Sequence, residues 1–244
     1  MKFPNAYSGV KKIFSAEILS VIAVVLLIAA SVFGLLTAAA AISVETADAE
    51  TASSLVLAAG IFAIPTLAFG ACGTVLAIIS FILQLVGVSQ AKKDEPIFKT
   101  ALLFILIGII STAVSSITGT LMNSVQNLVG NRVLDIFNSF FSCLGKVATI
   151  LVFYYIITGI ISLADQIGNE KIAKQGKTII NCVMIILVLS LIATITASVF
   201  PQNGTNAILV GVLALAALVI EFIAYIIYLV FLGRAKKMLK EATE

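Results

Sequence analysis

The chain of 244 residues contains no histidine and no tryptophan, and it has only 4 prolines and 3 cysteines. Without histidine it lacks the commonest general base and the commonest neutral metal ligand. Cys72, Cys143 and Cys182 occur singly in separate apolar segments, so we expect small buried residues rather than metal ligands or disulfides. The chain also lacks the nucleophile-elbow, Walker and dinucleotide-binding glycine sequences. These absences predict a protein that is not an enzyme and that carries no cofactor and no metal.

Charge is also scarce, because charged residues make up 11% of the chain and hydrophobic residues 61%. A soluble domain has about 25% charged residues. The apolar residues form six segments: 16–42, 54–88, 98–122, 140–163, 178–200 and 207–232. Each segment exceeds the ~18–20 residues that cross a bilayer as a helix. The sequence therefore predicts an all-α integral membrane protein, a bundle of six transmembrane helices in a single domain over residues 1–244.

The positive charges alternate between the two ends of these segments. Thirteen of the 15 Lys and Arg residues lie on connections that would face one side: Lys2, Lys11, Lys12, Lys92, Lys93, Lys99, Lys171, Lys174, Lys177, Arg234, Lys236, Lys237 and Lys240. Only Arg132 and Lys146 fall toward the other side. Because basic connections stay in the cytoplasm, both termini are predicted to be cytoplasmic. Such a collar suits anionic lipid head groups, whereas small scattered groups do not indicate nucleic-acid binding.

The first segment is the candidate for a signal peptide, since charged residues precede it and the small residues Ala38–Ala41 lie at its end. Its apolar run is about twice the usual 7–15 residues, so we interpret residues 16–42 as a retained helix. The short connections and the Ala- and Ile-rich composition are typical of a prokaryotic inner-membrane protein. The predicted location is therefore the cell membrane, as a multi-pass protein.

The second segment is too long for one simple crossing. As a helix its 35 residues span about 52 Å. Two crossings split at Pro65 or Gly70 would invert every later basic connection, so we predict one helix, kinked near Pro65, that projects beyond the outer head groups. The first, third and fourth segments show similar outer extensions, whereas residues 200–206 form a short link. An amphipathic helix lying on the outer interface is the alternative for residues 125–144.

Two further patterns each leave two interpretations open. The inner connections share short basic sequences, which favours three duplicated helical hairpins but is also typical of any basic linker at a membrane face. Gly108, Thr112, Ser116 and Thr120 recur at four-residue spacing. This face is either a polar pathway or a close-packing surface whose hydroxyls bond to backbone carbonyls one turn back.

Glu221 is the candidate functional residue, because it lies about eleven residues, or ~16 Å, from the inner end of the sixth segment. A carboxyl group at that depth is costly, so Glu221 either handles protons or cations or is a neutral side chain hydrogen-bonded to a tyrosine or a backbone carbonyl. Tyr225 and Tyr228 follow on the same helix face. Three further polar residues are placed in the inner halves of other segments: Gln84, Asn181 and Glu17. Together these six residues are predicted to line an intramembrane polar site.

Two function classes follow. The first is a non-enzymatic scaffold or accessory subunit that packs in the bilayer against other membrane subunits or against copies of itself. The second is a small transporter or channel that uses Glu221 and the inner-half polar residues.

Overall fold

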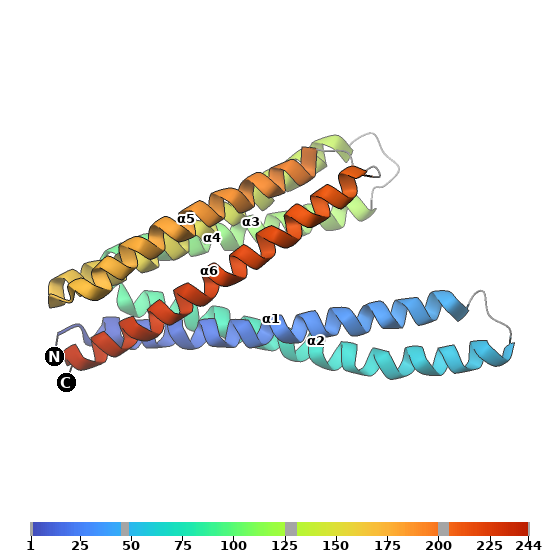
Figure 1. The fold of residues 1–244 in the computed structure, drawn as a ribbon, viewed down its shortest axis with the longest axis horizontal. Coiled ribbons are helices and arrows are strands. Elements are labelled where there is room, and N and C mark those ends of the chain that lie inside the picture. Colours follow the sequence, from blue (N-terminus) through green and yellow to red (C-terminus); the bar gives the residue numbers. More distant parts are fainter. Residues whose placement is uncertain (1, 45–48, 125–130, 200–204, 244) are drawn as a thin grey trace. The chain divides into compact units, whose positions relative to one another are not determined.

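The computed structural model describes the backbone of residues 2–44, 49–124, 131–199 and 205–243, and the side chains of residues 2–43, 53–121, 134, 136–185, 188 and 222–243. These parts of the chain are all-helical (Figure 1). The helices are α1 Pro4–Val44, α2 Ala49–Ala91, α3 Ile97–Ser124, α4 Asn131–Ile167, α5 Glu170–Val199 and α6 Thr205–Thr243. Each predicted apolar segment falls on one of these helices, apart from Phe200, which lies outside the described residues, and most helices extend beyond the segment at both ends.

The second helix is continuous through Pro65, as predicted. Residues 54–64 lie in the same 43-residue helix as residues 65–91, so they do not fold back as a re-entrant loop. A proline inside a helix removes one backbone hydrogen bond. The helix nevertheless continues on both sides of Pro65, through turns that consist mainly of apolar residues. The position of its outer end relative to the head groups stays a prediction.

The fourth helix is likewise longer than its apolar segment. It begins at Asn131 and continues without a break to Ile167. Residues 131–144 are therefore the first turns of α4, and the alternative of a separate interfacial helix is wrong for this stretch. Residues 125–130 lie outside the described part of the chain. The outer extensions predicted for the first four helices do not appear as a difference in helix length, since α3 has 28 residues and α5 has 30.

A two-residue connection joins α4 to α5. Gly168 has a φ of 82°, a conformation that glycine adopts without steric cost. The N–H of Gly168 donates to the carbonyl of Asp165, and the N–H of Asn169 donates to that of Ala164, which is the Schellman pattern of a helix end. The Asn169 side chain then accepts from the N–H of Ile172 and caps α5. The chain thus reverses direction within one turn of each helix.

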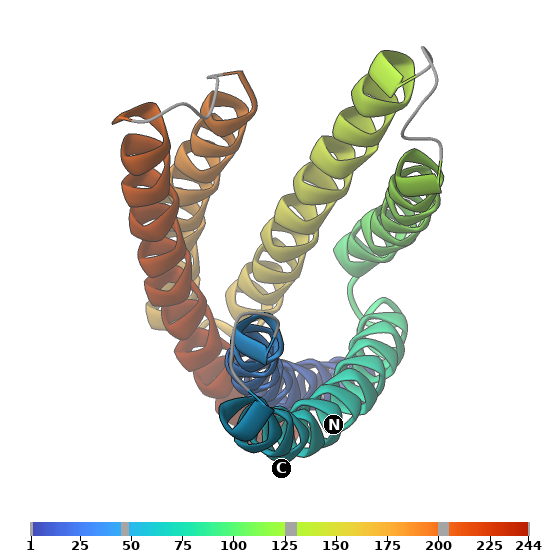
Figure 2. The same ribbon diagram turned by 90° about the vertical axis from the view of Figure 1, so that its right-hand side faces the viewer.

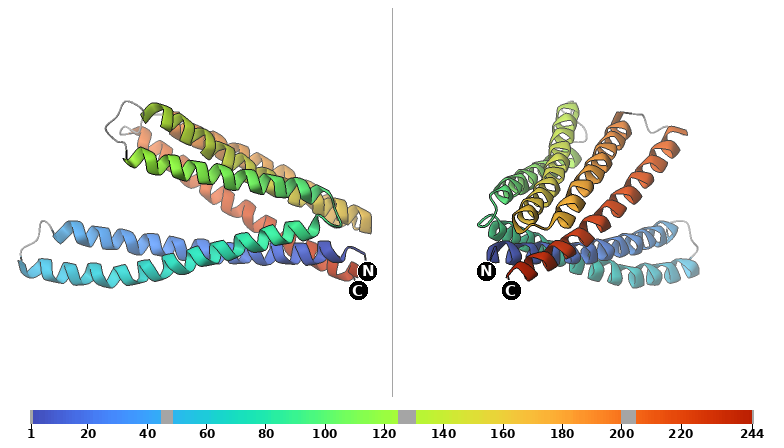
Figure 3. Two further views of the ribbon diagram at one scale, coloured as in Figure 1. Left: turned by 180° about the vertical axis from the view of Figure 1, so that it is seen from behind. Right: turned by 60° about the vertical axis from the view of Figure 1, so that its left-hand side comes forward.

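The chain divides into two compact units, residues 12–86 and residues 1–11 with 87–244. We call the first the hairpin unit and the second the four-helix unit. In the hairpin unit, α1 and α2 run antiparallel and side by side (Figure 3). Phe33 packs against Phe62 and Phe69, with ring centroids 6.4 and 5.8 Å away. A Cβ on Gly73 would lie 2.9 Å from the Leu27 side chain, so glycine allows the two helices to approach closely there.

The four-helix unit contains α3 to α6, the first turns of α1 and the last turn of α2. Helix α4 is central, because it contacts α3, α5 and α6. Figure 2 shows α3 with α4 as one antiparallel pair and α5 with α6 as a second pair. The largest completely buried side chains include Phe98, Ile160 and Phe231. They lie toward the basic ends of the helices, where the core of this unit is concentrated.

Many large apolar side chains point out of the protein. Leu35, Ile64 and Leu67 are exposed by 71, 71 and 74% of their surface. Soluble proteins rarely expose contiguous apolar faces of this extent. Over the described residues, four helices are long and apolar enough to cross a membrane: Pro4–Ser43, Ser53–Ala91, Ile97–Leu121 and Ile136–Ile167. The structure thus supports an all-helical protein whose apolar faces suit lipid.

The cysteines correct one expectation. Cys72, Cys143 and Cys182 are exposed and not buried. They lie on outward helix faces, where a small and weakly polar thiol is as acceptable next to lipid as inside a core.

Several hydroxyl groups of α3 bond to backbone carbonyls one turn back, but Thr112, Ser116 and Thr120 of the predicted packing face are exposed. Thr120 donates to the carbonyl of Ser116, four residues earlier, at 2.9 Å. Thr118 donates in the same way to Val114 at 2.9 Å. The Ser115 hydroxyl instead donates to Asn138 of α4 at 2.7 Å. Thr118 is buried whereas Thr120 is exposed, so bonds to backbone carbonyls satisfy hydroxyl groups on both the inward and the outward faces of α3.

Candidate functional site

Glu221 lies on α6, 16 residues after the helix begins at Thr205. Its backbone is helical, and its side chain lies outside the described residues. The prediction that its carboxyl group points into the bundle therefore stays a prediction. The residues that follow it on the same helix face are described.

Tyr225 and Tyr228 have rings 6.4 Å apart, as their spacing predicts. Tyr228 is only 2% exposed and packs edge-on against Phe153 of α4, with ring centroids 4.8 Å apart. Edge-to-face aromatic pairs of this kind add about 0.5–1.5 kcal/mol to the effect of burial. Tyr228 therefore belongs to the core of the four-helix unit, and Tyr225 is half-buried beside it.

Glu17 and Gln84 meet in the hairpin unit. The Gln84 amide donates to the Glu17 carboxyl group at 3.3 Å, and Glu17 is 5% exposed. One turn away, the Ser80 hydroxyl donates to the carbonyl of Ala16 at 2.7 Å. Three polar groups thus join α1 to α2 within an otherwise apolar pair of helices. A buried carboxyl group in such surroundings needs hydrogen-bond donors, and the amide supplies one.

The Asn181 side chain of α5 is exposed. The structure therefore brings together two pairs from the predicted site, Glu17 with Gln84 and Tyr225 with Tyr228. The first pair belongs to the hairpin unit and the second to the four-helix unit. A common pocket for all six residues stays a prediction.

The sequence analysis missed a second polar cluster, at the connection between α2 and α3. Asp94 accepts hydrogen bonds from the Asn5 side chain at 2.9 Å and from the Ala6 N–H at 2.7 Å. A carboxylate at this position satisfies a free backbone donor at the start of α1 and interacts favourably with the helix dipole. The Ser8 hydroxyl donates to Gln90 at 3.0 Å in the next turn.

Glu95 is the buried member of this cluster, at 4% exposure. Its carboxyl group accepts from the Ser162 hydroxyl at 2.8 Å and from the Gln166 amide at 2.9 Å, both on α4. It also accepts from the N–H of Ile97 at 3.4 Å, at the start of α3. Glu95 thereby ties the end of α4 to the beginning of α3. The sequence Glu95-Pro96 before an apolar run is a helix-start signal that indicates the capping role, but not the contact with α4.

These contacts define what the two clusters can do. Asp94 and Glu95 connect the start of α1, the start of α3 and the end of α4. Their carboxyl oxygens accept hydrogen bonds from groups at these helix ends. Glu17 and Gln84 form an acid–amide pair inside the hairpin. Among the residues that the structure describes, no group of three or more acidic, Cys or His side chains is close enough to hold a metal ion.

No protein-family model matches the chain, and neither a curated protein nor a solved structure matches it.

Proposed function

We propose that the chain is a six-span membrane protein with both termini in the cytoplasm, acting as a non-enzymatic scaffold or accessory subunit of a membrane complex. The alternation of basic connections supports this orientation, and the four apolar spans of α1 to α4 support the membrane location. The antiparallel pairs α1–α2, α3–α4 and α5–α6 are consistent with an origin in three hairpins. The composition favours a prokaryotic plasma membrane.

An outward face of α2 carries the scaffold proposal. Its residues alternate at three- and four-residue spacing and are all exposed: Leu57, Gly60, Ile64, Leu67 and Ala71. Nothing lies within 4 Å of a Cβ placed on Gly60. This spacing is that of helix–helix seams, and small residues within lipid allow a second backbone to approach. We name these five residues the α2 seam, and its partner is a transmembrane helix of another subunit or of a second copy.

The seam is tested by cross-linking in native membranes. Leu67→Cys, in a background with the three native cysteines replaced by Ser, should give one defined cross-linked species. Adding Gly60→Ile and Ala71→Ile should abolish that species, because bulky side chains block close helix approach. Ala38→Cys on exposed α1 is the matched control and should cross-link weakly. Equal, diffuse cross-linking at both positions would contradict the proposal.

Topology is tested separately by accessibility of single cysteines. Lys93→Cys should react only after the membrane is opened, whereas Gln202→Cys should react with an impermeant reagent from outside. Reaction of position 93 from outside would exclude the six-span orientation.

The buried Glu17–Gln84 pair favours the second candidate, a small transporter or channel. An acid held within apolar helices is a recurring element of proton and cation pathways. In this proposal Glu221 is a separate candidate acid, on the four-helix unit. Glu221→Gln should then abolish flux in proteoliposomes while the protein still folds. Unchanged flux, or the absence of any flux in the native protein, would remove this candidate.

A further inference from the structure

A surface groove runs between the first turns of α5 and the last apolar turns of α6. The α5 side is formed by Lys171, Lys174, Gln175, Thr178 and Ile179. These residues lie at i, i+3, i+4, i+7 and i+8, so they share one helix face. The face changes from basic to apolar over eight residues, or about 12 Å along the helix.

The α6 side of the groove shows the same gradient in the opposite chain direction. Ile226, Ile227, Val230, Phe231 and Arg234 line it. The three aliphatic residues are exposed by 40 to 47%, whereas Phe231 is 1% exposed. Because α5 and α6 are antiparallel, the Arg234 end of one stripe lies beside the Lys171 end of the other. The groove is therefore basic at one end and apolar at the other.

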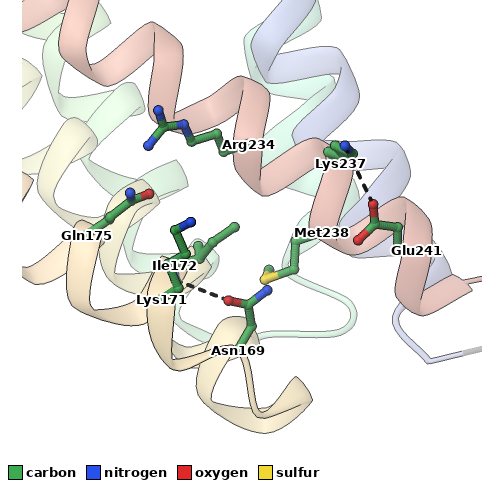
Figure 4. A pocket seen from close by; sticks show the side chains of 8 residues that line it. All are labelled: Asn169, Lys171, Ile172, Gln175, Arg234, Lys237, Met238 and Glu241. Carbon is green, nitrogen blue, oxygen red and sulfur yellow. Dashed lines mark hydrogen bonds and ion pairs between the residues drawn. The ribbon is translucent and has the colours of Figure 1, made fainter.

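The groove has a volume of about 540 Å³. Its basic end continues into a second hollow of about 580 Å³, which shares Lys171, Gln175 and Arg234. Figure 4 shows these three side chains around the same open space. Gly176 makes the underlying contact possible, since a Cβ there would collide with Ile161 and lie 3.2 Å from the Phe231 ring.

The charge around the groove has one sign. No carboxylate lines the groove itself, and in the adjoining hollow Glu241 is 4.0 Å from Lys237. Within the described part of the chain, no carboxylate forms an ion pair with Lys171, Lys174 or Arg234. Three cations beside an amide and a hydroxyl, above an apolar channel, match a phosphate-bearing head group with an attached acyl chain.

We propose that this groove binds one anionic phospholipid of the cytoplasmic leaflet, and we call it the lipid groove. The phosphate lies among Lys171, Lys174 and Arg234. The first part of an acyl chain lies along Ile226, Ile227 and Val230. This inference rests on the proposed membrane placement, because that placement puts the basic end at head-group depth.

The test uses the full-length protein in detergent micelles, with bound lipid measured by native mass spectrometry. Phosphatidylglycerol should be retained at a stoichiometry of one, and phosphatidylcholine should be retained at least about tenfold more weakly. The variant K171Q/K174Q/R234Q should lose at least about tenfold in phosphatidylglycerol affinity. The variant K92Q/K93Q/K99Q removes the same charge from another basic connection, so it should bind normally.

Val230→Trp separates the two halves of the site. It fills the apolar end while keeping all three cations, so phosphatidylglycerol binding should fall although the charge is unchanged. If the triple variant does not fold, judged by its helical signal and elution volume, R234Q alone and Val230→Trp decide the question.

Other outcomes overturn the proposal. Equal loss in both triple variants would mean a general charge effect. Displacement of lipid by inorganic phosphate at equal concentration would mean a site for a soluble anion. Micelle binding does not depend on orientation, so failure of the cysteine topology test with intact lipid binding would reject only the membrane placement.

Discussion

The hairpin unit and the four-helix unit bury different kinds of side chain. In the hairpin unit the completely or nearly completely buried apolar residues are Ile13, Ala16, Ala23 and Ala30. In the four-helix unit they include Phe98, Phe231 and Tyr228. Small side chains let helices approach closely, and in lipid this approach replaces the hydrophobic driving force. Large interlocking side chains resemble the interior of a soluble domain, where packing itself specifies the structure.

The difference means that equivalent truncations should have unequal effects in the two units. The polar contacts also differ. In the four-helix unit Glu95 accepts hydrogen bonds from groups on α3 and α4, whereas in the hairpin unit the Gln84 amide donates a hydrogen bond to Glu17 at 3.3 Å. The expected effects below run from the largest to the smallest.

Tyr228→Ala should destabilise the protein by about 3–5 kcal/mol, because it empties a space in the core next to Phe153. Leu67→Ala, on a side chain that is 74% exposed, should change the free energy of unfolding by less than about 0.5 kcal/mol. Reversible unfolding in mixed micelles measures both. Equal losses would show that the exposed Leu67 contributes as much to stability as the buried Tyr228, which would contradict the contrast.

Gly9→Ala should destabilise by about 1–3 kcal/mol, because the added Cβ would lie 2.5 Å from the backbone carbonyl oxygen of Gly87. A backbone atom cannot move aside as a flexible side chain can. Gly60→Ala is the matched change in the hairpin unit, with nothing within 4 Å of the new Cβ. It should stabilise the helix by about 0.5–1 kcal/mol. Opposite signs in the same unfolding assay confirm the contrast, and a shared sign contradicts it.

Glu95→Gln should cost about 1–2 kcal/mol, because it replaces a charge-assisted acceptor of the Ser162 and Gln166 donors by a neutral amide. Glu241→Gln makes the same chemical change at an exposed pair 4.0 Å from Lys237. It should have almost no effect on stability. Hydrogen exchange at the ends of α3 and α4 should rise in the first variant alone.

Apart from the control substitutions, Gln84→Leu should have the smallest effect, a loss of about 0.5–1.5 kcal/mol, because it removes one long hydrogen bond to the buried Glu17. The contrast with Glu95→Gln becomes larger if Gln84→Leu lowers the free energy of unfolding by only about 0.5 kcal/mol. A loss exceeding that of Glu95→Gln would show that the acid–amide pair dominates the hairpin unit, which would strengthen the transport candidate.

The predicted site shows where reasoning from one sequence stops. The shared face of Tyr225 and Tyr228 follows from helical spacing, and both rings do lie together. The contact of Glu17 with Gln84 joins residues 67 positions apart, and it depends on the register of α1 against α2. Glu95 was missed for the same reason, since its partners on α4 lie 67 and 71 positions away.

Local chemistry alone was sufficient for the helices. Long apolar runs predict the helices directly, because a helix depends on contacts between residues within a few positions of one another. Charge alternation was likewise sufficient to predict an orientation. Tertiary structure decided which faces meet: it turned the cysteines outward, placed α4 at the centre of its unit, and aligned the basic ends of α5 and α6 into one groove. Those outcomes depend on the rotation and register of one long helix against another, which no local pattern specifies.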